Sequence, residues 1–406
     1  MKVEFRSPRN QSEFMDTVRC FFHEALDNKT DFDAQVRREA KYIQEDPWIT
    51  RDDTLAAFLD GKVVSLVQIF RRPIHIGKFV LQMGGIGSVY TLPAYRHKRY
   101  SSQLMKVGVA YMKEAGYDIS FLTTRIPSHY AKEGWVVYPT FSMRLDLPSD
   151  GFKAPNESHV DCGPFNEDSN GIIAIYSQFN SLRSGTVVRN SAYWYNQIEY
   201  LGDEPALYWK ARRNGELAAY LRSVDWNVVE VGFSQGQDRE LVNLLKHVFA
   251  HARAEGVKTI DALVPLNFQG LFEGVGCKVS RSESCSMMVR IINFESLLRK
   301  IIPLLRLRLV ESDFSKWKGL IAIQYEAGIQ VLNINEGELS ILIESVTPDI
   351  SLRLSQEQLI KLLFGDMGIE HIIFSNNLDL KKTEVELLNV LFPRDQFCMW
   401  DFDCAF

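Results

Sequence analysis

A tight basic loop stands between a candidate strand and a candidate helix within residues 84–117. The loop and the first helical turn carry four basic residues and two serines: Arg96, His97, Lys98, Arg99, Ser101 and Ser102. A helix N-terminus presents unpaired backbone N–H groups and the positive end of the helix dipole, and both favour phosphate. Basic side chains at the same point add charge-assisted hydrogen bonds. The pattern therefore indicates a pyrophosphate site, with a solvated basic turn as the alternative.

The segments on either side of this loop alternate between strand and helix patterns. Residues 11–45 contain the start and stop signals of two helices. Residues 101–114 have the pattern of an amphipathic helix that ends at Gly116. We expect strands at 55–59, 63–70, 80–83, 86–92 and 119–124, then a short helix at 129–133 and a last strand at 135–145. This order predicts a mixed α+β or α/β unit.

A second copy of the same order follows. The glycines that end corresponding helices, Gly116 and Gly256, are 140 residues apart, and Gly134 and Gly274 have the same spacing. Two landmarks at one spacing favour an internal duplication over chance similarity of two αβ units. The second copy has a shorter loop without the basic run, and neither Gly270 nor Phe272, opposite Tyr130, has a hydroxyl. We therefore expect the second copy to be structural.

The block VYTLPAYRHKRYSSQLM, with ISFLTT and HYAKEGW after it, resembles the acyl-CoA signature of the GNAT N-acyltransferase superfamily. Tyr130 precedes Gly134 by the four residues typical of that family. One departure is that Arg99 stands where the family has glycine, with Ser101 at the Gly/Ala position. Glycine allows the backbone to approach phosphates without steric strain. The Arg99 side chain must therefore point away for CoA to bind normally.

The layout of the whole chain resembles the enhanced-intracellular-survival (Eis-type) branch of that superfamily. The resemblance implies a tandem GNAT fold with a catalytic domain at 1–150 and a degenerate GNAT-like domain at 151–292. It also implies a sterol-carrier-like domain at 293–406, where we expect helices at 294–309, 355–364 and 381–391 around three short strands. It further implies a homo-oligomer, namely a hexamer.

The resemblance also assigns roles to individual residues in the attack of an amine on acetyl-CoA. A backbone N–H near Val89, on the strand that continues through Tyr90 and Thr91, would stabilise the developing oxyanion. Tyr130 would protonate the departing sulfur as general acid, or else it only packs the short helix against the sheet. The terminal carboxylate of Phe406 would accept the proton of the ammonium. Because the last seven residues include Trp400, Phe402 and Phe406, we expect the tail to dock rather than fray.

Composition narrows the classes of protein that remain. The 406 residues exceed the size of one core and include 46% hydrophobic and 24% charged residues. The net charge of -5 does not indicate a nucleic-acid partner. No apolar run reaches the length of a membrane span, and the six cysteines show no zinc-site spacing, so we expect no metal. These features fit a soluble, cytoplasmic protein.

Two functional hypotheses follow. The first is an acetyl-CoA-dependent N-acetyltransferase that acts on a primary amine of a small cationic molecule, with aminoglycoside-like or polyamine acceptors implied by the resemblance. The second is a degenerate member that binds an acyl-CoA or a lipid without turnover. Acids and aromatics within residues 22–48 either line an acceptor pocket or are ordinary surface and core residues.

Overall fold

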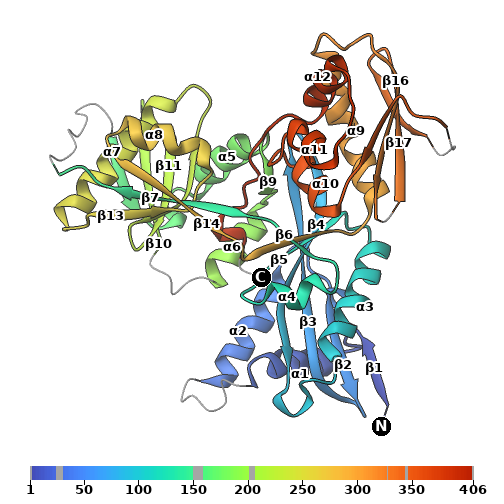
Figure 1. Cartoon of the computed structure of the whole chain (residues 1–406). Coiled ribbons are helices and arrows are strands. Elements are labelled where there is room, and N and C mark those ends of the chain that lie inside the picture. Colours follow the sequence, from blue (N-terminus) through green and yellow to red (C-terminus); the bar gives the residue numbers. More distant parts are fainter. Residues whose placement is uncertain are drawn as a thin grey trace.

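The structure is a computed structural model, and it describes residues 2–23, 31–149, 159–200, 206–326, 328–342 and 346–404. The chain forms three units, each built on its own sheet (Figure 1). The two larger units have mixed sheets with helices on both faces. The smaller third unit contains the C-terminal helices. The fold is thus mixed α/β, with two similar units in tandem followed by an additional unit.

The first sheet carries the candidate site. Its strands lie in the order β1 (Val3–Arg6), β2 (Thr54–Leu59), β3 (Lys62–Ile76), β4 (Phe79–Thr91), β5 (Ile119–Thr123), β15 (Met287–Ile291) and β6 (Val136–Val137), and β9 (Ser184–Val187) pairs with β3. The expected strands at 80–83 and 86–92 are one strand, β4. Gly84 and Gly85, which separate the two apolar runs in the sequence, pair in regular register with Arg71 and Phe70, so no turn interrupts the strand.

Four helices cover this sheet: α1 (Gln11–Phe21), α2 (Phe32–Glu45), α3 (Tyr100–Glu114) and α4 (Pro127–Ala131). Residues of β5 alternate between the two faces. Leu122 packs in one cluster with Tyr130 and residues of α3, whereas Ile119 and Phe121 belong to the large core shared with the rest of the chain. The first sheet therefore has α3 on one face and the other two units over much of the opposite face.

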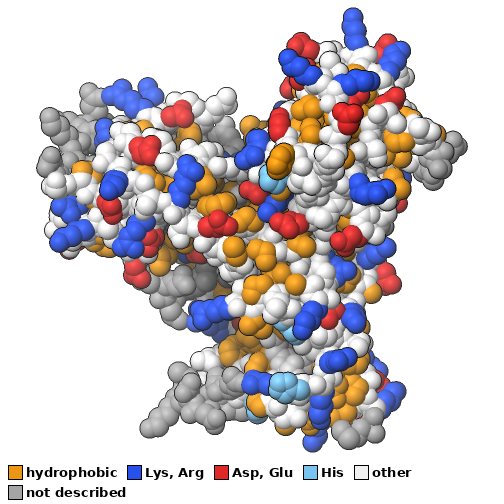
Figure 2. Space-filling view, in the orientation of Figure 1, with side chains coloured by type: hydrophobic (Ala, Val, Ile, Leu, Met, Phe, Trp, Pro, Cys, Tyr) orange, Lys and Arg blue, Asp and Glu red, His pale blue; other side chains and the backbone are white. Residues whose placement is uncertain are grey.

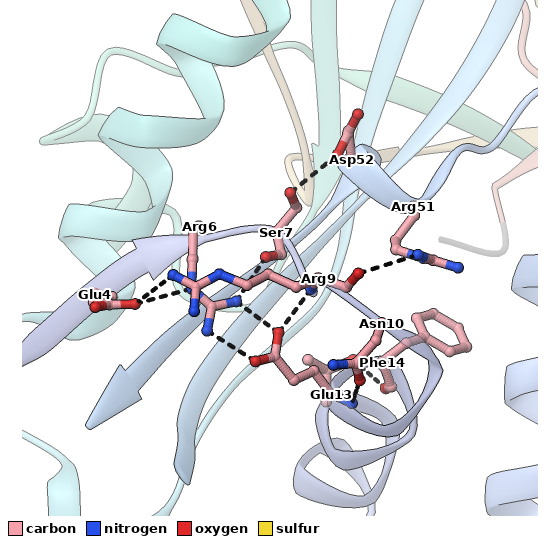
Figure 3. A network of polar contacts seen from close by, with 10 residues as sticks. Glu4, Arg6, Ser7, Arg9, Asn10, Glu13, Phe14, Arg51 and Asp52 are labelled. Atoms are coloured by element: carbon pink, nitrogen blue, oxygen red, sulfur yellow. Dashed lines mark hydrogen bonds and ion pairs between the residues drawn. The ribbon is translucent and has the colours of Figure 1, made fainter. Parts of the chain in front are cut away.

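Polar contacts attach α1 to the edge of this sheet (Figure 3). Arg6 on β1 donates two hydrogen bonds to the Glu13 carboxylate, at 2.7 and 3.0 Å, and its guanidinium lies 3.8 Å from the centre of the Phe58 ring. The Asn10 side chain accepts a hydrogen bond from the Glu13 N–H and so caps the helix. These contacts fix the start of α1 relative to β1 and β2.

The second sheet repeats the order of the first. Its strands lie in the order β8 (His159–Gly163), β10 (Ala206–Arg213), β11 (Glu216–Val224), β12 (Asn227–Phe233), β13 (Thr259–Ala262), β7 (Thr140–Asp146) and β14 (Lys278–Ser284). Its helices are α5 (Ser169–Asn180), α6 (Ser191–Tyr200), α7 (Asp238–Ala254) and α8 (Gln269–Gly274). The starts of β5 and β13 are 259 − 119 = 140 residues apart, which matches the glycine spacing.

The two large units exchange a strand. β7 follows β6 in sequence but lies in the second sheet between β13 and β14, and β15 lies in the first sheet between β5 and β6. The prediction of one strand at 135–145 is therefore wrong. The strand breaks at 138–139, where Pro139 cannot donate a ladder hydrogen bond, and the chain then crosses to the other sheet. The boundaries at 150 and 292 remain a proposal.

The third unit has a sheet in the order β18 (Glu338–Leu342), β17 (Gly328–Asn335), β16 (Lys318–Tyr325) and β19 (Ile350–Arg353). Its helices are α9 (Phe294–Val310), α10 (Gln356–Leu363), α11 (Ile369–Asn376) and α12 (Lys382–Leu391). Asp118, which precedes β5, accepts hydrogen bonds from Ser296 and Lys300 on α9, at 2.7 and 2.6 Å. This unit is thereby attached directly to the first.

Candidate active site

The carboxyl end of β4 separates from β5. Their parallel pairing runs from Met83 and Ile119 to Ile86 and Leu122, and beyond that point residues 87–91 pair with β3 alone. Two residues of β4, Ser88 and Val89, stand opposite one residue of β3, which is a β-bulge, and Ser88 has a left-handed φ of 46°. The bulge turns this stretch of backbone away from β5 and leaves one of its edges outside the sheet pairing.

Side chains hold the freed end of β4 in position. The hydroxyl of Ser65 on β3, which is fully buried, donates to the Tyr90 carbonyl at 2.9 Å and lies 2.7 Å from the Thr91 hydroxyl. The Arg96 side chain returns to the same strand, where its Nε donates to the Thr91 carbonyl at 3.3 Å. The strand end and the basic loop after it are thus one connected structure.

The loop between β4 and α3 has a backbone suited to anions. His97 and Arg99 have positive φ angles of 64° and 62°, the left-handed region that favours glycine. Arg99 is the N-cap residue of α3, and within the described segment 31–149 no side chain caps this helix. The first N–H groups of α3 are therefore available to an oxyanion, and its first turn contains no acidic residue.

The basic side chains of this loop all reach solvent. Arg96, His97, Lys98 and Arg99 are exposed, and Ser101 and Ser102 are partly exposed on the first turn of α3. Arg99 thus keeps the backbone conformation expected of glycine while its side chain lies at the surface. The Arg99 side chain lies in solvent, and phosphate binding beside it stays a prediction.

Tyr130 lies on α4 beside this loop. Its neighbour His129 has its Nε2 atom 3.5 Å from the Ser101 hydroxyl, which links α4 to the start of α3. The Tyr130 side chain is 9% exposed, and its hydroxyl has no hydrogen-bond partner among the described residues. Burial raises the pKa of Tyr130, so the hydroxyl stays protonated at neutral pH and can donate a proton.

The tail docks as far as the structure describes it. Trp400 is fully buried and donates from its indole nitrogen to the Asn180 side chain at 2.9 Å, and Phe402 is 1% exposed. Asp403 is held by Arg189, which lies between β9 and α6. The tail therefore packs against the second unit. Phe406, the predicted source of the terminal carboxylate, lies outside the described residues.

The equivalent loop of the second unit has different chemistry. The turn between β12 and α7 is residues 234–237, shorter than residues 92–99 of the first unit. Asp238 and Glu240 lie in the first turn of α7. Their negative charges interact favourably with the positive end of the helix dipole and would repel a phosphate group. This contrast agrees with a pyrophosphate site in the first unit only.

Sequence reasoning found the loop, both serines and Tyr130. The structure brings these residues together beyond the carboxyl ends of the inner strands β4 and β5. It missed the left-handed Ser88, the support given by Ser65, and the contact of His129 with Ser101. Only the Gly87-Ser88 pair inside a strand pattern hinted at the bulge. Among the described residues the structure contains no cluster of metal-ligating side chains and no helix that could span a membrane.

Comparisons with known proteins agree with this geometry. Residues 9–138 match the family model of the acetyltransferase (GNAT) domain. No curated protein matches the chain in sequence. A probable N-acyltransferase from Enterococcus faecalis has the same fold, with a TM-score of 0.76 and 15% identity over 99% of this chain and 100% of that chain.

Two further solved structures share the fold over nearly their whole length. A GCN5-related N-acetyltransferase from Anabaena variabilis has a TM-score of 0.70 and 14% identity, over 98% of this chain and 99% of that chain. Eis1 from Mycobacterium abscessus has a TM-score of 0.65 and 12% identity, over 96% of this chain and 97% of that chain. At such identities the likeness concerns the fold.

Proposed function

Because residues 9–138 are an acetyltransferase domain of the GNAT type, we propose that the protein transfers the acetyl group of acetyl-CoA to a primary amine of a small cationic molecule. The observation that carries this proposal is the loop at 96–102, where a left-handed backbone and an uncapped helix N-terminus meet exposed basic side chains. A diphosphate needs these donors and this charge.

In the proposed reaction the amine nitrogen attacks the thioester carbonyl and the carbon–sulfur bond breaks. The backbone N–H of Val89, beside the bulge, would donate to the oxyanion that develops in the tetrahedral intermediate. The Tyr130 hydroxyl would give its proton to the departing sulfur. The terminal carboxylate of Phe406 would take the proton of the incoming ammonium, a role that burial of the preceding tail residues supports.

The finer features of the protein remain predictions. They are the choice between aminoglycoside-like and polyamine acceptors, the Eis-type assignment, the hexamer, the cytoplasmic location and the sterol-carrier character of the third unit. A protein that binds acyl-CoA or lipid without turnover is the competing function. The exposed basic loop favours the binding of a CoA thioester over that of a lipid alone, and the buried Tyr130 hydroxyl beside it supports turnover.

A direct assay separates the two functions. Release of free thiol from acetyl-CoA is followed over a panel of polyamines, aminoglycosides and simple alkylamines. We expect at least one amine to give turnover that Tyr130→Phe removes. No thiol release across the panel, together with no CoA binding at millimolar concentration, would exclude the transferase.

A further inference from the structure

Tyr193 on α6 contacts both the tail and the first sheet. Its hydroxyl donates to Oδ1 of Asp403 at 3.1 Å, and the centre of its ring lies 4.9 Å from the guanidinium carbon of Arg72. Asp403 stands three residues before Phe406, and Arg72 belongs to β3. The Tyr193 side chain is fully buried. One tyrosine of the second unit therefore connects the tail with the sheet that carries the candidate active site.

Arg72 is a fixed point on the first sheet. It is 1% exposed, and its Nη2 atom lies 2.8 Å from Oδ2 of Asp46, the residue after α2. Ile69 packs in the cluster around α3, whereas Phe70 packs with α1 and α2. Because side chains alternate along a strand, Arg72 lies on the Phe70 face, opposite α3. The contact between Tyr193 and Arg72 therefore locates the tail on that face.

The helix that carries Tyr193 is attached to the first unit by further contacts. The Asn196 and Gln197 side chains of α6 donate to the backbone carbonyl and the hydroxyl of Tyr42 on α2, at 3.1 and 2.8 Å. The centres of the Trp48 and Tyr193 rings are 4.7 Å apart. These contacts give the Tyr193 hydroxyl a fixed position to which the tail can bind.

Asp403 is held by both of its oxygens. Arg189 donates to Oδ1 and Oδ2, and Tyr193 adds a third hydrogen bond at Oδ1. Figure 2 shows acidic and basic side chains spread over the surface of the molecule, where water screens their interactions. Asp403 is buried instead, so its hydrogen bonds are shielded from water. Arg189 attaches the tail to the second unit, whereas Tyr193 directs it towards the first.

We propose that Tyr193 is a positioning residue for the terminal carboxylate. By holding Asp403 against the first sheet, it sets the position from which that carboxylate reaches the reacting amine. The three residues after Asp403 extend the chain by at most about 11 Å, so the place of Asp403 limits where the chain can end. A displacement of about 1 Å at a reacting group can lower a rate by up to about 10²-fold. The proposal rests on the proposed function, in which the terminal carboxylate takes the proton of the ammonium.

Steady-state kinetics of Tyr193→Phe tests the effect on turnover. The variant removes the hydroxyl and keeps the ring, so we expect kcat to fall about threefold to tenfold. The KM for acetyl-CoA should stay within about twofold of the wild-type value, because the loop at 96–102 is unchanged. Tyr195→Phe is the matched control, since Tyr195 lies on the same helix and is 47% exposed. It should leave both constants unchanged.

Digestion of the native full-length protein with carboxypeptidase A gives a readout that needs no acetyl transfer. Release of the terminal phenylalanine requires the tail to detach locally. Tyr193→Phe removes one hydrogen bond from the tail, so the rate of release should rise about threefold to tenfold. Tyr195→Phe should not change it. If no amine gives turnover with the wild-type protein, the proposed function fails, whereas the digestion still reports on the position of the tail.

A double variant shows whether Tyr193 acts through Asp403. Asp403→Asn keeps the shape of the side chain and should also speed the release of phenylalanine. The double variant should release it no faster than Asp403→Asn alone, because both changes affect the same contact. Thermal unfolding checks that each variant is folded. An unchanged rate of release in folded Tyr193→Phe overturns the proposal, and so do additive effects in the double variant. Lower thermal stability of Tyr193→Phe with wild-type kcat and release would likewise overturn it, because the role of Tyr193 would then be structural.

Discussion

Arg189 and Asp403 are joined by two hydrogen bonds of 2.9 Å, from Nε to Oδ1 and from Nη2 to Oδ2. The same guanidinium donates to both oxygens of Glu230, at 3.2 and 2.6 Å, and its centre lies 4.4 Å from the centre of the Phe402 ring. The three charged side chains are fully buried. The tail is thus attached to the second unit by a charged cluster shielded from water.

Removing one charge from this cluster should destabilise the folded protein. Arg189→Met would leave Glu230 and Asp403 buried without their counterion, and the loss of one partner of a buried pair costs about 3–5 kcal/mol. We expect Arg189→Met to lower the free energy of unfolding in urea by that amount. Arg213→Met removes an exposed arginine of the same unit and serves as the control. Equal stability of the two variants would show that the cluster contributes nothing.

Position 99 should tolerate glycine but not a branched residue. Arg99→Gly relieves the left-handed backbone but removes one charge, so the KM for acetyl-CoA should stay within about threefold of the wild-type value. Arg99→Val places a β-branched residue at the same φ, where the left-handed conformation costs on the order of 1–2 kcal/mol, and the KM should rise about tenfold. Steady-state kinetics with varied acetyl-CoA measures both. Similar KM values for acetyl-CoA in the glycine and valine variants would show that binding does not require a left-handed backbone at position 99.

The alkaline limb of the pH–rate profile should report on Tyr130. A general acid must be protonated to act, and burial raises the pKa of Tyr130 above the ordinary tyrosine value. Activity should therefore persist through about pH 10 and decline only above it. In Tyr130→Phe we expect kcat to fall about 10²-fold and this limb to disappear. An unchanged alkaline limb in the variant would assign it to another group.

A peptide fused after Phe406 should abolish activity. The extension converts the terminal carboxylate into an amide, which cannot accept a proton from the ammonium. Because residues up to Cys404 are already packed, thermal unfolding should change little. The same peptide fused before Met1 is the control. Full activity of the C-terminal fusion would exclude the terminal base without affecting the role of Tyr130.

Local patterns predicted the local elements well. The helix at 101–114 is α3 from Tyr100, and the helix expected at 294–309 matches α9, because both carry a clear 3.6-residue apolar period. The repeat spacing predicted the second copy. The pattern could not show which sheet a strand joins, because apolar alternation in 140–146 fits either one.

In the candidate site, too, the residue types were predictable from the sequence, whereas most of the backbone geometry and the long-range contacts were not. The basic run and Tyr130 were visible in the sequence because their residue types carry the chemistry. The left-handed angle of His97 was not visible, because that residue type does not require it, and the angle of Arg99 was suggested only by the family's glycine at that position. The joining of Asp403 to Arg189 spans 214 residues and follows only from tertiary packing.

The exchange of β7 and β15 has a consequence for how the chain is made. The first sheet lacks its inner strand β15 until residue 291 has been synthesised. The first unit therefore cannot finish folding during translation before most of the second unit has also been made. Deletion of either half would leave the other with a gap between paired strands. Neither of the two units is therefore expected to fold when it is produced without the other.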